Sequence, residues 1–84
     1  MANKKTKTEN KQFTPIAFSS DVFKGIYSNV ALIQHTKREF IFDFVLQVKD
    51  HAEVVSRIIM SPEQTKDFQK ALNENIKLFD EKKQ

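Results

Sequence analysis

The most regular alternation of apolar and polar residues lies between positions 39 and 48. Every residue of one parity is apolar: Phe40, Phe42, Phe44, Leu46 and Val48. The other parity mixes the two kinds of side chain: Ile41, Asp43, Val45 and Gln47. A period of two is typical of a β-strand, whose successive side chains point to opposite faces of a sheet. The pattern predicts a strand over 39–48 with one strongly apolar face.

Two further segments are rich in aliphatic residues and predict neighbouring strands at 28–35 and 53–60. The polar residues between the three candidates are few enough for hairpin connections. A three-residue loop at 49–51 places Asp43 opposite Arg57 on one face and collects the Phe side chains on the other. The same register predicts these further pairs: Val48–Ala52, Gln47–Glu53, Leu46–Val54, Val45–Val55, Phe44–Ser56, Phe42–Ile58, Ile41–Ile59 and Phe40–Met60.

The segment from Ser61 onward carries the signals of a helix start and one apolar stripe. Ser61 is a favoured N-cap, Pro62 suits the first helical position, and Gln64 stands at the capping-box position. Apolar residues then recur with a period near that of a helix: Phe68, Ala71, Leu72, Ile76 and Phe79. We expect a helix from about Pro62 to about Glu81.

The N-terminal part of the chain divides into a polar arm and an apolar lead-in. Residues 1–12 carry four Lys and one Glu with few apolar side chains, which predicts a disordered basic arm. Residues 13–27 are rich in aliphatic and aromatic side chains, but Pro15 and Gly25 interrupt them and no period fits. We expect this lead-in to be irregular or short-stranded and to pack onto the domain.

These elements predict one α+β domain over residues 13–84, a three-stranded antiparallel β-meander followed by one C-terminal helix (β-β-β-α). The helix is expected to cover the Phe-rich face of the sheet through Phe68, Leu72, Ile76 and Phe79. The opposite face is also apolar, and large exposed apolar patches usually mark an interface. We therefore predict a homodimer that associates through Ile33, Ile41, Asp43, Val45, Val55, Arg57 and Ile59. A monomer whose second face is closed by its own lead-in is the alternative.

Composition narrows the possible functions of this 84-residue chain. It has no Cys and one Gly, which excludes disulfides, Cys-ligated metals, thiol nucleophiles and glycine-rich phosphate loops. The net charge of +3 lies entirely in residues 1–12, because residues 13–84 hold ten of the 14 basic and ten of the 11 acidic side chains. No apolar run approaches the roughly 20 residues of a membrane helix. We expect a cytoplasmic protein without membrane contact.

No group of residues predicts catalysis or a bound cofactor. Asp43 and Arg57 could act as a site acid and its modulator, but a functional acid normally has a second titratable neighbour. A cross-strand ion pair that fixes the register is the favoured interpretation. His35 and His51 fall at a strand end and in a loop, without the three or four convergent ligands of a metal site. We expect no enzymatic activity, no cofactor and no metal.

Nucleic-acid binding is the alternative function. The lysine-rich arm could hold phosphates, and a helix that follows a sheet also occurs in modules that bind single strands by aromatic stacking. The predicted contacts are Lys4, Lys5, Lys7, Lys11, Lys37, Arg38 and Lys49. Against this interpretation, the Phe residues are the best partners for the helix, and residues 13–84 carry no net positive charge.

Several short motifs connect the chain to a known family. They are Gly25-Ile26-Tyr27-Ser28-Asn29, Glu39-Phe40, Asp43-Phe44, Ser56-Arg57-Ile58, Met60-Ser61-Pro62, Ala71-Leu72 and Asn75-Ile76. Over about Gly25 to Phe79 the chain resembles an uncharacterised prokaryotic family catalogued as domain of unknown function 3467. The lysine arm and residues 22–24 depart from that pattern. The resemblance implies a strand–strand–strand–helix module and no established activity.

Overall fold

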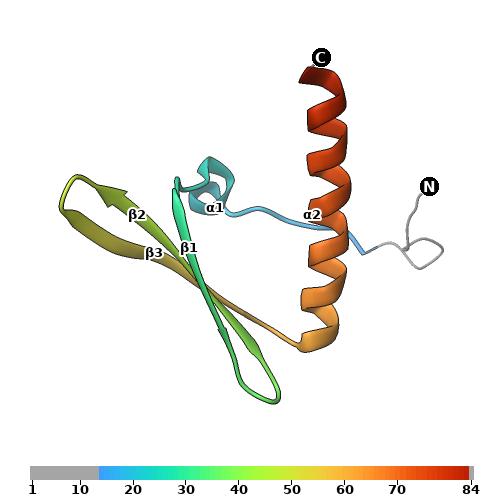
Figure 1. Cartoon of the computed structure of the whole chain (residues 1–84), viewed down its shortest axis with the longest axis horizontal. Coiled ribbons are helices and arrows are strands. Elements are labelled where there is room, and N and C mark those ends of the chain that lie inside the picture. The colour runs from blue at the N-terminus through green and yellow to red at the C-terminus, as the bar shows by residue number, and fades with distance from the viewer. Residues whose placement is uncertain (1–13, 84) are drawn as a thin grey trace.

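The computed structural model describes residues 14–83, and the basic arm predicted for residues 1–12 lies outside them. In chain order, the elements are α1 (Ser20–Lys24), β1 (Val30–His35), β2 (Phe40–Val48), β3 (His51–Met60) and α2 (Pro62–Lys83). β2 lies between β1 and β3 and pairs antiparallel with both, and α2 follows β3 (Figure 1). The predicted fold class, a three-stranded antiparallel meander followed by a C-terminal helix, is confirmed.

The register of β2 and β3 agrees with the prediction away from the turn. The predicted pairs in this half of the hairpin are confirmed: Phe40–Met60, Ile41–Ile59, Phe42–Ile58, Asp43–Arg57 and Phe44–Ser56. Because paired residues share a face, the Phe side chains of β2 lie on one side of the sheet and the ion pair lies on the other.

The register next to the turn differs from the prediction by one residue. The observed pairs are Val45–Val54, Leu46–Glu53, Gln47–Ala52 and Val48–His51. The turn is formed by two residues, Lys49 and Asp50, and not by three. The difference is absorbed at a register shift between Phe44 and Val45, where Val55 is left without a Cα partner. The four predicted pairs next to the turn are therefore wrong: Val45–Val55, Leu46–Val54, Gln47–Glu53 and Val48–Ala52.

Lys49 has a φ of 56°, in the left-handed region that residues with a Cβ rarely adopt. Replacing Lys49 with Gly should stabilise the fold by about 0.5–1 kcal/mol, because glycine adopts this angle without the steric cost of a side chain. Thermal unfolding followed by circular dichroism, at one protein concentration, measures the change. Lys49→Ala is the control and should leave the melting temperature nearly unchanged. A lower melting temperature for Lys49→Gly would contradict this description of the turn.

The register of β1 overturns one assignment in the predicted self-association face. Ile33 pairs with Phe42, so it lies on the face of the Phe side chains and not with Ile41. The cause is the loop between β1 and β2, which closes with a hydrogen bond from the Thr36 amide to the Glu39 carbonyl. This loop is one residue longer than the predicted one, and a change of one residue turns every side chain of the strand to the other face.

The pairing assigns the side chains to two faces. The Phe42 face carries Ala31, Ile33, His35, Phe40, Phe42, Phe44, Leu46, Val48, His51, Glu53, Ser56, Ile58 and Met60. The Asp43 face carries Val30, Leu32, Gln34, Ile41, Asp43, Val45, Gln47, Ala52, Val54, Arg57 and Ile59. Apolar side chains thus dominate both sides of the sheet, and each side needs a cover to keep them from water.

α2 begins at the predicted residue with a well-formed N-terminus. The Ser61 hydroxyl accepts a hydrogen bond from the Gln64 amide at 3.1 Å, and the Ser61 carbonyl accepts one from the Thr65 amide at 3.0 Å. Pro62 occupies the first helical position, where an amide would have no partner. Ser61 alone connects β3 to α2, so the direction of the helix is set within one residue.

α2 packs on the sheet only weakly, close to its first turns. The rings of Phe68 and Phe42 meet edge to face with their centroids 5.8 Å apart. Beyond this point α2 extends away from β2 and β3 (Figure 1). Leu72 and Ile76 remain 46% and 47% exposed. The expectation that these two side chains lie on the sheet is therefore wrong.

Very little of the described chain is buried. Phe42 (4% exposed), Val45 (7%) and Asp43 (8%) are the only buried residues among those described. The radius of gyration is 15.7 Å, against about 12 Å expected for a compact chain of this length. The molecule is open, with its sheet and its long helix in contact at one end.

The lead-in also differs from its prediction. Residues 20–24 form α1, whose N-cap Ser19 accepts a hydrogen bond from the Val22 amide at 3.2 Å. Phe18 and Phe23 meet edge to face with centroids 5.7 Å apart, and both remain exposed. The described part of the lead-in therefore contains a short helix and no strand, and its aromatic residues do not become buried against the sheet.

Candidate interaction surface

The stripe of α2 is the first uncovered apolar feature. Leu72 and Ile76 are four residues apart, the spacing that aligns side chains along one side of a helix. Charged residues follow the opposite side at the spacing of intrahelical Lys–Glu pairs: Lys70, Glu74, Lys77 and Glu81. The helix thus has one side suited to water and one apolar side with little cover in the described chain.

The Phe42 face is the second uncovered apolar feature. At its centre the ring of Phe42 stacks on that of Phe44, with centroids 6.3 Å apart and an angle of 12° between the rings. Its margins are exposed at Ile33, Val48 and Ile58. The centre of this face is therefore covered where α2 begins, and its outer parts are open.

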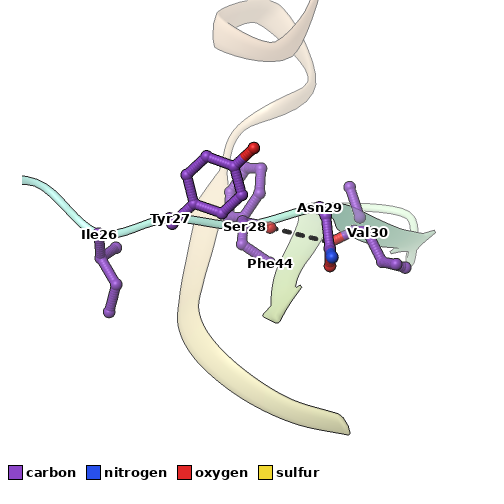
Figure 2. A pocket seen from close by; sticks show the side chains of 7 residues that line it. Ile26, Tyr27, Ser28, Asn29, Val30 and Phe44 are labelled. Atoms are coloured by element: carbon purple, nitrogen blue, oxygen red, sulfur yellow. Dashed lines mark hydrogen bonds between the residues drawn. The ribbon is translucent and has the colours of Figure 1, made fainter. Parts of the chain in front are cut away.

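A shallow hollow of about 570 Å³ opens beside the Phe42 face at the start of β1. Ala31 and Phe44 line it from the sheet, and the segment before β1 lines it from the side. Figure 2 shows the rings of Tyr27 and Phe44 on the same side of this segment, with Ile26 pointing away from them. Ser28 and Asn29 also line the hollow, and the remaining lining residues are aromatic or aliphatic and none is charged. Such a recess suits an apolar side chain better than a charged ligand.

Ser28 and Asn29 fasten the start of β1 to the end of β2. The Asn29 side chain donates to the Gln47 carbonyl and accepts from the Gln47 amide, each at 2.9 Å. The Ser28 hydroxyl lies 3.0 Å from the carbonyl oxygens of Val30 and Val45, and the first of these bonds is drawn in Figure 2. Sequence reasoning assigned no role to this pair. The sequence signal for this contact is an Asn directly before a strand. Its carboxamide has a donor and an acceptor, as a backbone residue has, and can therefore pair with the backbone of the neighbouring strand.

Asp43 and Arg57 form a bidentate ion pair across β2 and β3. Nε of Arg57 donates to Oδ1 of Asp43 at 2.6 Å, and Nη2 donates to Oδ2 at 2.9 Å. These hydrogen bonds hold the pKa of Asp43 below its usual 3.8; burial opposes the shift, and the charge of Arg57 adds to it. Both carboxylate oxygens are engaged, which fits a structural ion pair better than a catalytic acid.

The structure divides the residues of the predicted self-association set. The Asp43 face brings together Ile41, Asp43, Val45, Arg57 and Ile59. Ile33 lies on the other face, and Val55 lies at the register shift. Leu32 and Val54, which the prediction left out, are exposed on the Asp43 face. The loop lengths, which sequence reasoning misjudged, account for each of these differences.

The residues predicted to contact nucleic acid are not brought together in the described chain. Lys37 and Arg38 lie in the loop before β2, and Lys49 lies in the turn after it. The nine residues of β2 separate the two positions by about 30 Å. The other predicted contacts lie outside the described residues: Lys4, Lys5, Lys7 and Lys11.

The two histidines have aromatic or acidic neighbours. The ring of His35 stacks on Phe40 with centroids 5.3 Å apart, and His51 lies 3.6 Å from the Glu53 carboxylate in an exposed pair. Among residues 14–83, no three His, Asp or Glu side chains are grouped as metal ligands would be. Over the same residues, neither helix has both the length and the apolar character that crossing a membrane requires.

Comparison with known proteins identifies a family. The model of a family described as a protein of unknown function (DUF3467) matches residues 1–83. The chain belongs to the DUF3467 family. The match is wider than the range from Gly25 to Phe79 and includes the lysine arm and residues 22–24. No curated protein and no solved structure matches this DUF3467 chain.

The candidate site of this DUF3467 chain is an apolar surface. It consists of the α2 stripe, centred on Leu72 and Ile76, and of the open part of the Phe42 face with its hollow. Both are apolar, and α2 meets the sheet where Phe68 contacts Phe42.

Proposed function

We propose that this DUF3467 protein is a non-enzymatic module that self-associates, with a homodimer as the simplest assembly. The observation that carries the proposal is the uncovered apolar surface, since Phe42 and Val45 are the only buried apolar residues among those described. Full burial of one Leu or Ile side chain contributes about 1.5–3 kcal/mol. Covering Leu72, Ile76 and the margins of the sheet therefore supplies stability that a small open chain otherwise lacks.

The state of the titratable groups supports binding in preference to catalysis. Asp43 is the one buried titratable side chain among the described residues, and Arg57 occupies both of its oxygens. A general acid or base needs a position at which it can exchange a proton with a substrate. Self-association through apolar surfaces requires no general acid or base.

Sedimentation velocity and native mass spectrometry of the full chain test this proposal. The expected result is a defined oligomer, most simply a dimer of the 9.8 kDa chain, at micromolar concentration. Added salt should leave the assembly intact, because apolar burial is not screened as charge pairs are. A stable monomer at micromolar concentration would overturn the proposal.

Nucleic-acid binding is the second candidate, and its support is the net charge of +3 confined to residues 1–12. Retention on single-stranded DNA or RNA should then fall steeply with salt. Deleting residues 1–12 should abolish retention and leave the oligomeric state unchanged. Absence of retention at low salt excludes this second candidate without affecting the first.

A further inference from the structure

We infer that α2 of each chain packs across the Phe42 face of a second copy, so that two chains exchange helices reciprocally. The inference rests on the proposed self-association and names the surfaces that perform it. A second copy is the occupant because one chain supplies both complementary parts, the apolar stripe and the open apolar face. The centre of each part is apolar. Glu53 and His51 lie at the β3 edge of the Phe42 face, opposite Leu46 and Val48, where they form an exposed pair, so the two parts can be joined without burying an unpaired ion.

The joint between β3 and α2 is short. Ser61 is the only residue between the two elements, and its hydroxyl and carbonyl both bind the first turn of α2. Pro62 restricts the backbone further, because its ring fixes φ near −65°. From this joint α2 extends away from β2 and β3 (Figure 1), so the remainder of the stripe is left for another molecule.

The two surfaces match in length. α2 continues for 15 residues after Phe68, which is about 22 Å of helix. The Phe42 face continues from Phe42 to Val48 in β2, which is about 20 Å of strand. The hollow beside Ala31 and Phe44 lies within this length and offers a recess for a side chain of the stripe.

The area that such an exchange buries is close to the lower limit for a biological interface. One side of a helix about 10 Å wide and 22 Å long presents roughly 220 Å². The helix covers a similar area of sheet, and symmetry makes the contact twice, so the total is on the order of 900 Å². A biological interface is expected to bury about 1,000 Å² or more, and crystal contacts mostly bury less than about 800 Å².

Two other modes of self-association bury less. The edge strand β1 has six residues, and pairing it with its copy would bury on the order of 400 Å². Pairing the two α2 stripes with each other would bury roughly 440 Å². Both areas are about half of that for the exchange and lie in the range of crystal contacts. Reciprocal helix exchange is therefore favoured over these two modes.

Crosslinking between introduced cysteines tests the exchange, because the chain has no Cys of its own. Ala31→Cys places a thiol on the Phe42 face beside the hollow, and Ile76→Cys places one on the stripe. The two variants are prepared separately, mixed and treated with an oxidant or a short bismaleimide. Any link between the two different variants is then intermolecular. The expected result is efficient linkage of Ala31→Cys to Ile76→Cys.

Matched controls use the neighbouring residues on the opposite sides, Leu32→Cys on the Asp43 face and Lys77→Cys on the charged side of α2. Preferential linkage of Ile76→Cys to Leu32→Cys would overturn the inference in favour of the Asp43 face. A defined oligomer in which Ile76→Cys links to neither sheet position would overturn it as well. Either crosslinking result leaves the proposed self-association standing. A monomeric wild-type chain would overturn the self-association and the helix exchange together.

Substitution of the stripe gives a second, quantitative test. Leu72→Ser combined with Ile76→Ser should raise the dimer dissociation constant by about 100-fold or more, because two anchors of the interface are lost. Lys70→Ser combined with Glu74→Ser is the matched control and should change the constant by less than about threefold. Circular dichroism verifies that both variants retain the helix. A dissociation constant unchanged by the stripe substitutions would overturn the inference.

Discussion

Replacing Phe42 with Ala is expected to lower the free energy of unfolding by about 3–5 kcal/mol. Phe42 is the most buried residue described, and its ring contacts Phe44 in the sheet and Phe68 in α2. The substitution leaves a cavity at the place where the two layers meet. A core of this size rarely supplies more than about 3–5 kcal/mol, so the variant should be largely unfolded at 25 °C. Loss of the far-ultraviolet circular dichroism signal measures this.

Phe23→Ala is the matched control, because it removes the same ring from an exposed position. Its effect should stay within about 0.5 kcal/mol. Urea titrations of the two variants must be compared at one protein concentration, since association adds to the apparent stability. If Phe42→Ala cost less than about 1 kcal/mol, Phe42 would not be the centre of the core.

Replacing Arg57 with Leu is expected to reverse the pH dependence that Asp43 gives to stability. In the wild type, Arg57 holds the pKa of Asp43 below its usual 3.8, so the ion pair stabilises the fold above about pH 4. That stability is lost as the pH falls through the lowered pKa. Without Arg57, burial alone acts on the carboxyl and raises its pKa. The variant should be destabilised at pH 7 and should recover as the pH falls toward about 4, because protonation removes an unpaired charge.

Thermal unfolding between about pH 3 and pH 7 measures this reversal. The control replaces both partners, Asp43→Leu with Arg57→Leu, and should unfold near the wild-type temperature at pH 7 because no lone charge is left. It should also lack the recovery toward low pH. If Arg57→Leu lost stability on acidification as the wild type does, the pKa of Asp43 would not be governed by Arg57.

The element types and the ion pair could be predicted from the sequence because both depend on local patterns. The alternation in β2 needs no knowledge of its neighbours, and Asp43 has one well-placed cationic partner, Arg57. The face on which Ile33 lies could not be predicted in this way. It depends on the length of the loop that ends at Glu39, and no turn signal such as Asn-Gly fixes that length.

The open arrangement of α2 could not be predicted from the sequence pattern either. The stripe shows which side of the helix is apolar, but an apolar side suits its own sheet and the sheet of another chain equally well. What decides between them is the direction in which α2 leaves β3 at the one-residue joint Ser61, which a pattern of apolar positions does not record. The short helix α1 escaped prediction for a simpler reason. Its five residues span little more than one turn, too few to reveal a period.

The one-residue joint at Ser61 also governs how many chains an exchange of helices can link. When the second copy returns its helix to the first, the assembly closes as a pair with twofold symmetry. When each helix instead reaches a new copy, the same contact propagates into an open-ended filament. The angle at which α2 leaves the sheet selects between these outcomes. A stiff, short joint therefore sets the size of the particle as well as the direction of the helix.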